Sequence, residues 1–272
     1  MEKLNLSVFV KNASLATQKI IHTLKNMTPD LYVYHQKGAG GDVSIGADLV
    51  SEKIYMDFLL PLAHIDSEES GRILSPSQTQ DTIILDPLDG SDNFLSHIPY
   101  YGSSLALCDE MGNVKESVVF NFCTGEGIAR IHQSKKCFRF CIDEILKGDF
   151  AANLLALQQK DHFSESVLGN VKCGIFEKAY VNPHFAHLLY ENKIKFRSLG
   201  ASALSIANAH RANFMLFLGN IRAFDSKAGI FLCEDLHHKH TADYLLISRD
   251  KHIFDMIHQL LLKEQYGLGK FF

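Results

Sequence analysis

Several features are absent from the 272-residue sequence, and most of these absences narrow the class of protein. There is no tryptophan, no Cys-x-x-Cys pair and no run approaching the roughly 18 apolar residues of a membrane-spanning helix. Without cysteine pairs, neither a zinc ribbon nor a thiol redox motif is indicated, so the six cysteines are predicted to be free thiols. The first residues show no basic stretch followed by an apolar core, so no secretory leader is predicted. We therefore expect a cytoplasmic protein with no membrane partner.

A surplus of positive charge is also lacking. The chain carries 27 basic and 31 acidic side chains, which gives a formal net charge of −4 and a pI of about 6.4. Nucleic acids attract basic surfaces, so no nucleic-acid partner is expected. An anionic substrate would need local help from a metal ion, a helix N-terminus or a few placed cations. The 46% hydrophobic and 21% charged residues are otherwise ordinary for a globular protein.

The pattern of apolar residues predicts helices and strands that alternate irregularly, which favours an α/β protein with layered α+β character. A length of 272 residues predicts one large domain or two modest ones, and we place a boundary between residues 1–145 and 146–272. Polar loops are expected over 71–80 and around 237–240. Helices are predicted over 4–27, 49–59, 142–159, 201–212, 226–236 and 250–265, and strands over 82–85, 103–108, 114–122 and 214–218.

The most informative segment is an acidic turn that begins at Asp86. Pro87 holds Asp86 in an extended conformation, and Gly90 allows the positive φ of a sharp turn. Ser91 or the following aspartate is then a natural helix N-cap. This strand, turn and helix would set Asp86 and Asp89 close together, and a divalent cation would relieve their repulsion. Oxygen ligands favour Mg²⁺ or Mn²⁺ over zinc, and the helix start favours a phosphate beside the metal.

Each acidic segment also has a plain structural interpretation. Asp-Pro and Asp-Gly are common turn dipeptides, and the pair Glu68-Glu69 is typical of a solvated surface patch. Asp42 fits a turn, and Asp225 fits a helix N-cap. Their order and spacing along the chain favour a common site.

Taken together, these segments resemble the motifs of the inositol monophosphatase superfamily, which are Mg²⁺-dependent, lithium-sensitive phosphatases. The resemblance covers about residues 37–110 and 197–235 and is weak over 123–195. It implies a fold with alternating helix and sheet layers, shared with sugar phosphatases of the fructose-bisphosphatase type. The matching segments are Gly41-Asp42-Val-Ser-Ile-Gly-Ala-Asp48, Ser67-Glu68-Glu69, Asp86 to Phe94, Arg197-Ser-Leu-Gly200-Ala-Ser-Ala-Leu204 and Phe224-Asp225-Ser-Lys-Ala-Gly229.

The resemblance also implies roles for individual residues. Two or three Mg²⁺ ions are implied as cofactors, with Mn²⁺ as the alternative. The implied metal ligands are Glu68, Asp86, the carbonyl of Leu88, Asp89 and Asp225.

The remaining implied roles concern water and phosphate. Asp48 and Ser91 match an acid–hydroxyl pair that orients and deprotonates the attacking water, and Glu68 is counted with them as catalytic. The N–H groups of Gly90 and Ser91 match a phosphate cradle. Substrate contacts are further implied for Asp225 and Ala201. Direct attack by water is then expected, with no phosphoenzyme.

The match predicts an enzyme that hydrolyses a small phosphorylated metabolite, either an inositol phosphate or a sugar phosphate such as fructose 1,6-bisphosphate. Two alternatives stay open, namely a 3'-phosphoadenosine 5'-phosphate phosphatase and a degenerate member that binds a partner protein. Lys227 stands where the family has alanine, and it is interpreted either as a surface lysine or as a cation for a second substrate phosphate. Family members often form dimers, so a homodimer is expected by analogy.

Overall fold

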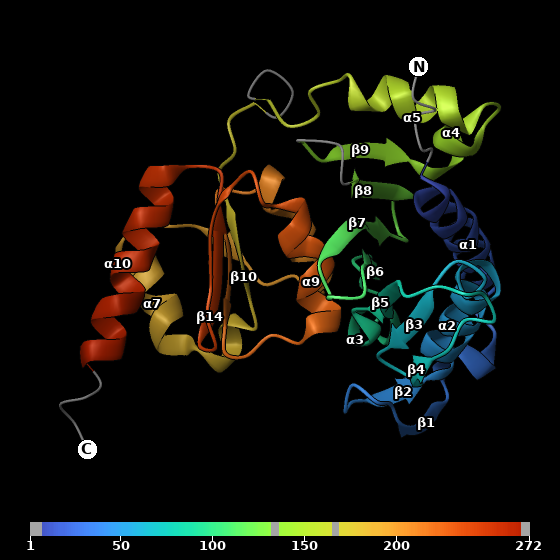
Figure 1. Ribbon diagram of the computed structural model, residues 1–272. Helices are drawn as coiled ribbons and strands as arrows, with labels where there is room; N and C mark the ends of the chain where they lie inside the picture. The colour runs from blue at the N-terminus through green and yellow to red at the C-terminus, as the bar shows by residue number, and fades with distance from the viewer. Residues whose placement is uncertain (1–6, 132–135, 165–168, 268–272) are drawn as a thin grey trace.

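The computed structural model describes residues 7–131, 136–164 and 169–267. In these ranges the chain forms alternating layers of helices and sheets, which confirms the predicted fold class (Figure 1). Seven strands form the large sheet in the order β4-β3-β5-β6-β7-β8-β9. They are β3 (His64–Ser67), β4 (Gly71–Ile73), β5 (Thr82–Asp89), β6 (Gly102–Cys108), β7 (Val114–Asn121), β8 (Glu126–Ile131) and β9 (Phe138–Cys141).

A smaller sheet has the order β11-β10-β12-β14-β13, and a separate pair is formed by β1 and β2. The strands of the smaller sheet are β10 (Gly174–Glu177), β11 (Phe196–Arg197), β12 (Met215–Leu218), β13 (His237–His240) and β14 (Tyr244–Ser248). The separate pair is β1 (Tyr34–Lys37) and β2 (Val43–Ile45).

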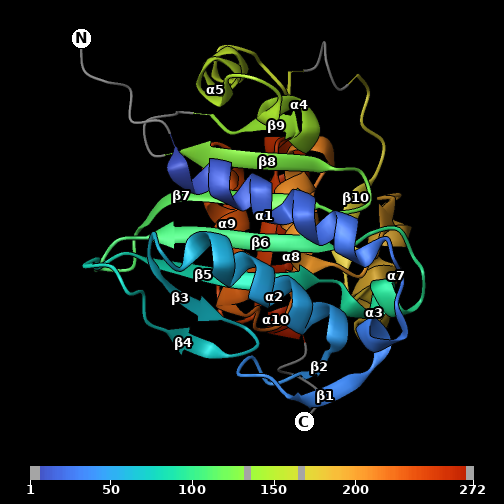
Figure 2. The same ribbon diagram turned by 90° about the vertical axis from the view of Figure 1, so that its right-hand side faces the viewer.

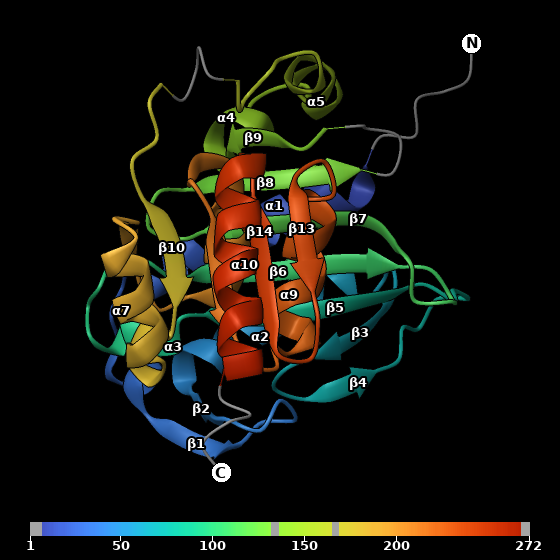
Figure 3. The same cartoon turned by 90° about the vertical axis from the view of Figure 1, so that its left-hand side faces the viewer.

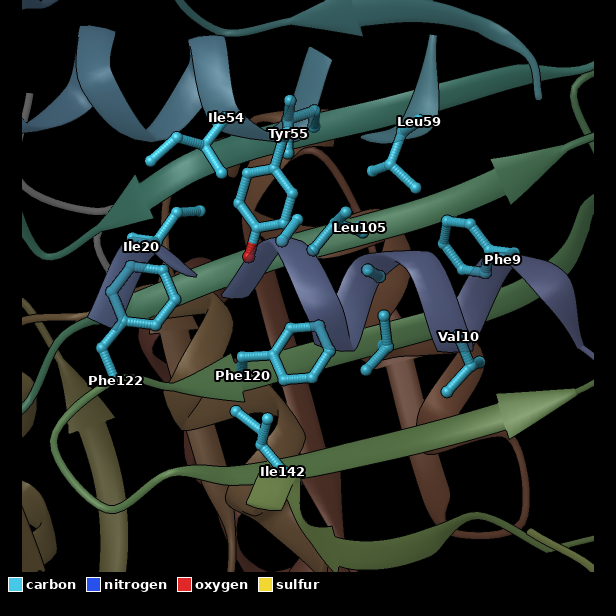
Figure 4. Packing of buried hydrophobic residues seen from close by; sticks show 14 of the residues in the cluster. Phe9, Val10, Ile20, Ile54, Tyr55, Leu59, Leu105, Phe120, Phe122 and Ile142 are labelled. Atoms are coloured by element: carbon cyan, nitrogen blue, oxygen red, sulfur yellow. The ribbon is translucent and has the colours of Figure 1, made fainter. Parts of the chain in front are cut away.

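Two helices, α1 (Val8–Leu24) and α2 (Gly46–Leu59), cover one face of the large sheet (Figure 2). Their buried faces meet the sheet in an apolar cluster that includes Ile20, Leu105 and Phe120 (Figure 4). The Tyr55 side chain is buried in this cluster, and its hydroxyl is hydrogen-bonded to the Thr17 hydroxyl at 2.7 Å. Burial of these side chains fixes α2, and α2 carries Asp48 in its first turn.

The middle layer lies between the two sheets and consists of α8 (Ser202–Ala207), the 3-10 helix η3 (Asn208–Arg211) and α9 (Ala223–Leu232). Side chains such as Val119 from the large sheet and Leu245 from the small sheet pack against these helices. A Cβ at Gly229 would lie 2.4 Å from Cγ2 of Ile206, so only glycine allows α8 and α9 to approach this closely. This packing sets the start of α9, and with it Asp225.

The outer face of the small sheet is covered by α7 (Pro183–Glu191) and α10 (Lys251–Gly267) (Figure 3). Leu189 and Ile257 from these helices pack against Phe176 and Leu246 of the sheet. The remaining elements are α3 (Ser91–Leu95), α4 (Ile142–Leu146), α5 (Phe150–Gln158), η1 (Pro29–Tyr32) and η2 (Ala179–Val181).

The structure departs from the sequence predictions in a few places. The helix predicted over 142–159 is broken into α4 and α5, because Gly148 adopts a φ of +77° between them. The loop predicted around 237–240 is the edge strand β13, whose side chains are all exposed. The loop over 71–80 contains β4, and the helix predicted over 201–212 ends at Ala207 and continues as η3.

Residues 4–6 of the first predicted helix lie outside the described residues. The domain boundary at residue 145 stays a prediction. Among the described helices, none combines the length and the apolar character needed to cross a membrane.

Candidate metal centre and active site

The candidate site is built where two neighbouring parallel strands end. Strands β3 and β5 are paired in parallel, so the residues that follow β3 lie at the same edge as the end of β5. Glu68 comes directly after β3, and Asp86 lies near the end of β5. Asp225, from the first turn of α9, completes the group: one carboxylate oxygen from each of the three residues lies within 4.8 Å of the others. Three distant segments therefore converge on one point.

The end of β5 and the turn at Gly90 orient the next functional groups. A carboxylate oxygen of Asp86 accepts a hydrogen bond from the amide of Leu88 at 3.0 Å. Gly90 has a φ of +90°, and a Cβ placed there would lie 3.0 Å from the Cβ of Ala201. Ala201 is thus packed against the turn, and a Cβ at position 90 would be crowded by it and strained by the positive φ.

Asp89 is buried and points toward the C-terminal half of the chain. Its Oδ2 accepts a hydrogen bond from the amide of Leu204 in α8 at 2.9 Å. Burial, followed by the charge of Asp225, raises the pKa of Asp89 well above its usual range. The sequence prediction that Asp89 and Asp225 act together is consistent with this electrostatic proximity.

Asp48 and Ser91 lie within hydrogen-bonding distance, although 43 residues separate them. The Ser91 hydroxyl donates to Oδ1 of Asp48 at 2.7 Å and lies 3.0 Å from the carbonyl oxygen of Leu88. The other carboxylate oxygen of Asp48 accepts from the amide of Ile45 at 2.6 Å. Burial raises the pKa of Asp48 to about 7, against the lowering effect of these hydrogen bonds. A carboxylate with a pKa near neutrality is suited to proton transfer.

The carboxylates of the centre raise one another's pKa. Burial raises the pKa of Glu68 to about 7, with Arg222 acting against this and Asp225 adding to it. Burial and the charges of Glu68 and Asp89 raise the pKa of Asp86 well above its usual range. Such a cluster is costly unless cations neutralise it. An all-oxygen donor set fits Mg²⁺ or Mn²⁺, so the residues present are compatible with the implied ions.

Arg222 was not predicted as part of the site, yet its guanidinium lies among these carboxylates. Its Nη1 lies 2.6 Å from Glu68 Oε1 and 2.8 Å from Asp42 Oδ2, and its Nε lies 3.0 Å from Asp225 Oδ2. The guanidinium therefore supplies one positive charge where the resemblance implies metal ions. Its position three residues before Asp225, which allows an ion pair across one helical turn, was the signal available in the sequence.

The Gly-rich segment before Asp42 packs against the glutamate pair. The amide of Gly40 donates to the carbonyl of Glu68 at 2.6 Å, and the amide of Ala39 donates to the carbonyl of Glu69 at 2.9 Å. A Cβ at Gly40 would lie 2.5 Å from Cγ of Glu68. This segment thus holds the Glu68 side chain in place. Burial also raises the pKa of the neighbouring Glu69.

Lys227 lies on another side of α9. Its Nζ is 3.8 Å from where a Cβ of Gly112 would be, beside the turn between β6 and β7. It lines a pocket of about 470 Å³ together with Ile230 and Glu234. Its positive charge opposes the rise that burial causes in the pKa of the Cys108 thiol. This placement favours the interpretation of Lys227 as a surface lysine over that of a substrate cation.

The layered fold and the acidic centre define a protein with a candidate site for divalent cations. A family model described as the inositol monophosphatase family matches residues 6–237, so the chain belongs to this family of metal-dependent phosphatases, as its motifs predicted.

Individual relatives agree with this assignment. A fructose-1,6-bisphosphatase/inositol-1-monophosphatase of Thermococcus kodakarensis is 43% identical over 68 residues, which are 25% of this chain and 26% of that protein. An inositol-1-monophosphatase of Caulobacter vibrioides is 25% identical over 211 residues, 74% of this chain and 75% of that protein. The crystal structure of the extragenic suppressor protein SuhB from Bartonella henselae has the same fold, with a TM-score of 0.69 at 20% identity over 93% of this chain and 96% of that one.

Proposed function

We propose that this protein hydrolyses a small-molecule phosphate monoester with the help of Mg²⁺. The observation that carries the proposal is the convergence of Glu68, Asp86 and Asp225, with the hydrogen-bonded pair Asp48–Ser91 beside them. Glu68, Asp86, Asp89, Asp225 and the carbonyl of Leu88 would hold two or three ions. When bound, divalent cations activate a water molecule and stabilise the developing charge of the leaving group.

The side chains of the protein would handle the proton. The Ser91 hydroxyl would contact the attacking water and pass a proton to Oδ1 of Asp48, to which it already donates a hydrogen bond. The raised pKa of Asp48, about 7, makes that carboxylate a suitable acceptor near neutral pH. The amides of Gly90 and Ser91 would hold the phosphate, and Ala201 would border it at the turn. Water attacks phosphorus directly in this scheme, and no phosphoenzyme forms.

The proposed substrate class is a sugar phosphate, such as fructose 1,6-bisphosphate, or an inositol phosphate. Support comes from the name of the Thermococcus kodakarensis relative, which pairs both activities, and from that of the Caulobacter vibrioides relative. We further propose a cytoplasmic enzyme that forms a homodimer, as the family analogy suggests.

Phosphate release from a panel of metabolites, measured with Mg²⁺ and with Mn²⁺, tests the proposal. The panel includes inositol 1-phosphate, fructose 1,6-bisphosphate and 3'-phosphoadenosine 5'-phosphate. The Asp89→Asn variant is expected to lose turnover, because it removes a charge from the centre. Asp92→Asn is the matched control, because Asp92 is exposed in the first turn of α3.

Each outcome separates the proposals. Hydrolysis of an inositol or sugar phosphate by the wild type and by Asp92→Asn, but not by Asp89→Asn, supports the proposed function. A preference for 3'-phosphoadenosine 5'-phosphate would replace the substrate class. If the folded wild type releases no phosphate from any compound of the panel, the result would favour a protein-binding member of the family.

A further inference from the structure

A second group of metal-binding side chains lies away from the acidic centre. Cys137 precedes β9, His210 lies in η3, and Asp235 follows α9. Sγ of Cys137 lies 3.1 Å from Nε2 of His210, and that nitrogen lies 3.6 Å from Oδ1 of Asp235. Strand β9 forms the edge of the large sheet opposite to β3 and β4 (Figure 1). The Cys137–His210–Asp235 cluster is therefore separate from Glu68 and its neighbours.

We propose that Cys137, His210 and Asp235 bind one Zn²⁺ ion through Sγ, Nε2 and Oδ1. All three donor atoms lie within 4.8 Å of one another. In a tetrahedral zinc site, with bonds of about 2.3 Å to sulfur and about 2.0 Å to nitrogen or oxygen, neighbouring donor atoms lie roughly 3.3–3.6 Å apart. The Sγ–Nε2 and Nε2–Oδ1 distances of 3.1 and 3.6 Å are within about half an ångström of these values, and the Sγ–Oδ1 distance is at most 4.8 Å, so the three side chains would close in on the ion when it binds.

The donor set selects the kind of ion. A thiolate and an imidazole suit a borderline ion such as Zn²⁺, whereas Mg²⁺ prefers oxygen ligands. The thiolate and the carboxylate would together balance the charge of the ion. The positive charge of Arg130 acts to lower the pKa of both Cys137 and His210. Arg130 is itself paired with Glu234 at 3.2 Å.

The cluster is accessible from solvent through a pocket, and one of its side chains is restrained by ring packing. Cys137 and His210 are nearly fully buried, whereas the side chain of Asp235 is 33% exposed. A pocket of about 220 Å³ is lined by all three residues and by Phe163, so an ion can reach them and a water can take the fourth coordination position. The ring centroids of Phe163 and His210 are 4.6 Å apart, which restrains the imidazole.

The competing interpretation is a purely structural histidine. Nε2 of His210 also lies 3.2 Å from the carbonyl oxygen of Leu232, at the end of α9, and could simply donate a hydrogen bond there. In that case no ion binds. If the ion does bind, it ties β9 to η3 and to the segment after α9, so it should stabilise the contact between the large sheet and the middle layer.

Binding can be tested with Co²⁺ as a spectroscopic substitute for Zn²⁺, in excess Mg²⁺ so that the acidic centre is occupied. A thiolate ligand gives Co²⁺ a charge-transfer absorption that carboxylate sites cannot produce. The wild type is expected to develop this absorption with one equivalent of Co²⁺ and to unfold at a higher temperature with Zn²⁺. The Cys137→Ser variant should lose the absorption, and Asp235→Asn should weaken Co²⁺ binding by at least about tenfold.

Matched controls keep the test decisive. Cys123→Ser removes an exposed thiol and Asp57→Asn an exposed carboxylate of α2, and both should bind Co²⁺ as the wild type does. Since Asp235 is partly exposed, Asp235→Asn is expected to fold even if Cys137→Ser does not. A wild type without thiolate absorption would overturn the proposal, as would unchanged Co²⁺ affinity in Asp235→Asn. The result is independent of phosphatase activity.

Discussion

Replacing Arg222 with methionine is expected to tighten the binding of Mg²⁺ to the metal-free protein. The guanidinium makes contacts of 2.6 Å with Glu68 and 3.0 Å with Asp225, two of the implied metal ligands. A cation that binds these oxygens must displace or share those contacts. Methionine keeps much of the volume of the arginine stem but has no charge, so it removes the competitor.

The structure sets the size of the effect. Each charge-assisted hydrogen bond contributes on the order of 1.5–3 kcal/mol when it is shielded from water. The Arg222 side chain is 36% exposed, and its third partner, Asp42, is 80% exposed, so solvent screening reduces the total. A net competition of roughly 1.5 kcal/mol remains, which corresponds to an affinity gain of about tenfold.

Isothermal titration of Mg²⁺ into the metal-free protein measures this gain directly. Arg211→Met is the matched control, because Arg211 pairs with Glu126 outside the acidic centre and should leave the affinity unchanged. Unchanged or weaker Mg²⁺ binding by Arg222→Met would refute the idea that the guanidinium competes with the ions. It would indicate instead that Arg222 positions the ligands.

Three further predictions concern proton transfer by Asp48 and Ser91, the pH dependence of the free energy of unfolding, and backbone strain at Gly90. Since burial raises the pKa of Asp48 to about 7, kcat/KM should rise as pH increases through about 7, and Ser91→Ala should lower kcat by roughly 10²- to 10⁴-fold in a phosphate-release assay. The folded-state pKa of Glu68 is also raised to about 7, above its ordinary 4.5. The folded protein therefore favours the protonated forms of Asp48 and Glu68. Their contribution to the free energy of unfolding is fully present below pH 4 and is lost as pH rises through 7. Urea unfolding of the metal-free protein should accordingly show a stability loss of on the order of 2–4 kcal/mol between pH 5 and 8, which Mg²⁺ should reverse; constant stability would contradict this. Gly90→Ala should cost about 1–3 kcal/mol of unfolding free energy, because the residue has a φ of +90° and a crowded Cβ position. Gly125→Ala, at a φ of +69° with open space around it, should cost less, and equal losses would contradict the crowding argument.

The central part of the site could be predicted from the sequence because its chemistry is local. Pro87 and Gly90 predict a sharp turn after a strand, and the structure has that turn at Gly90, after β5 has continued to Asp89 with a register shift between Asp86 and Asp89. The contribution of Asp225 was recognised through the order of the motifs. Its actual approach to Asp86 depends on how α9 packs between the sheets, which no local rule provides.

The features that the sequence did not reveal depend on tertiary contacts. Arg222 has an ordinary local context, and only the fold brings it to Glu68. Strand β13 consists of exposed residues with three histidines, so it has no apolar alternation, and its pairing with β14 decides its structure. Cys137 and His210 are 73 residues apart and meet only across the interface of two layers.

The most direct test of the account is anomalous diffraction from a crystal of the wild-type protein grown with Mn²⁺. The account predicts anomalous peaks at the carboxylates of Glu68, Asp86 and Asp225, with the Asp89→Asn variant losing at least one of them. A map in which a saturating concentration of Mn²⁺ leaves no peak at these carboxylates would contradict it.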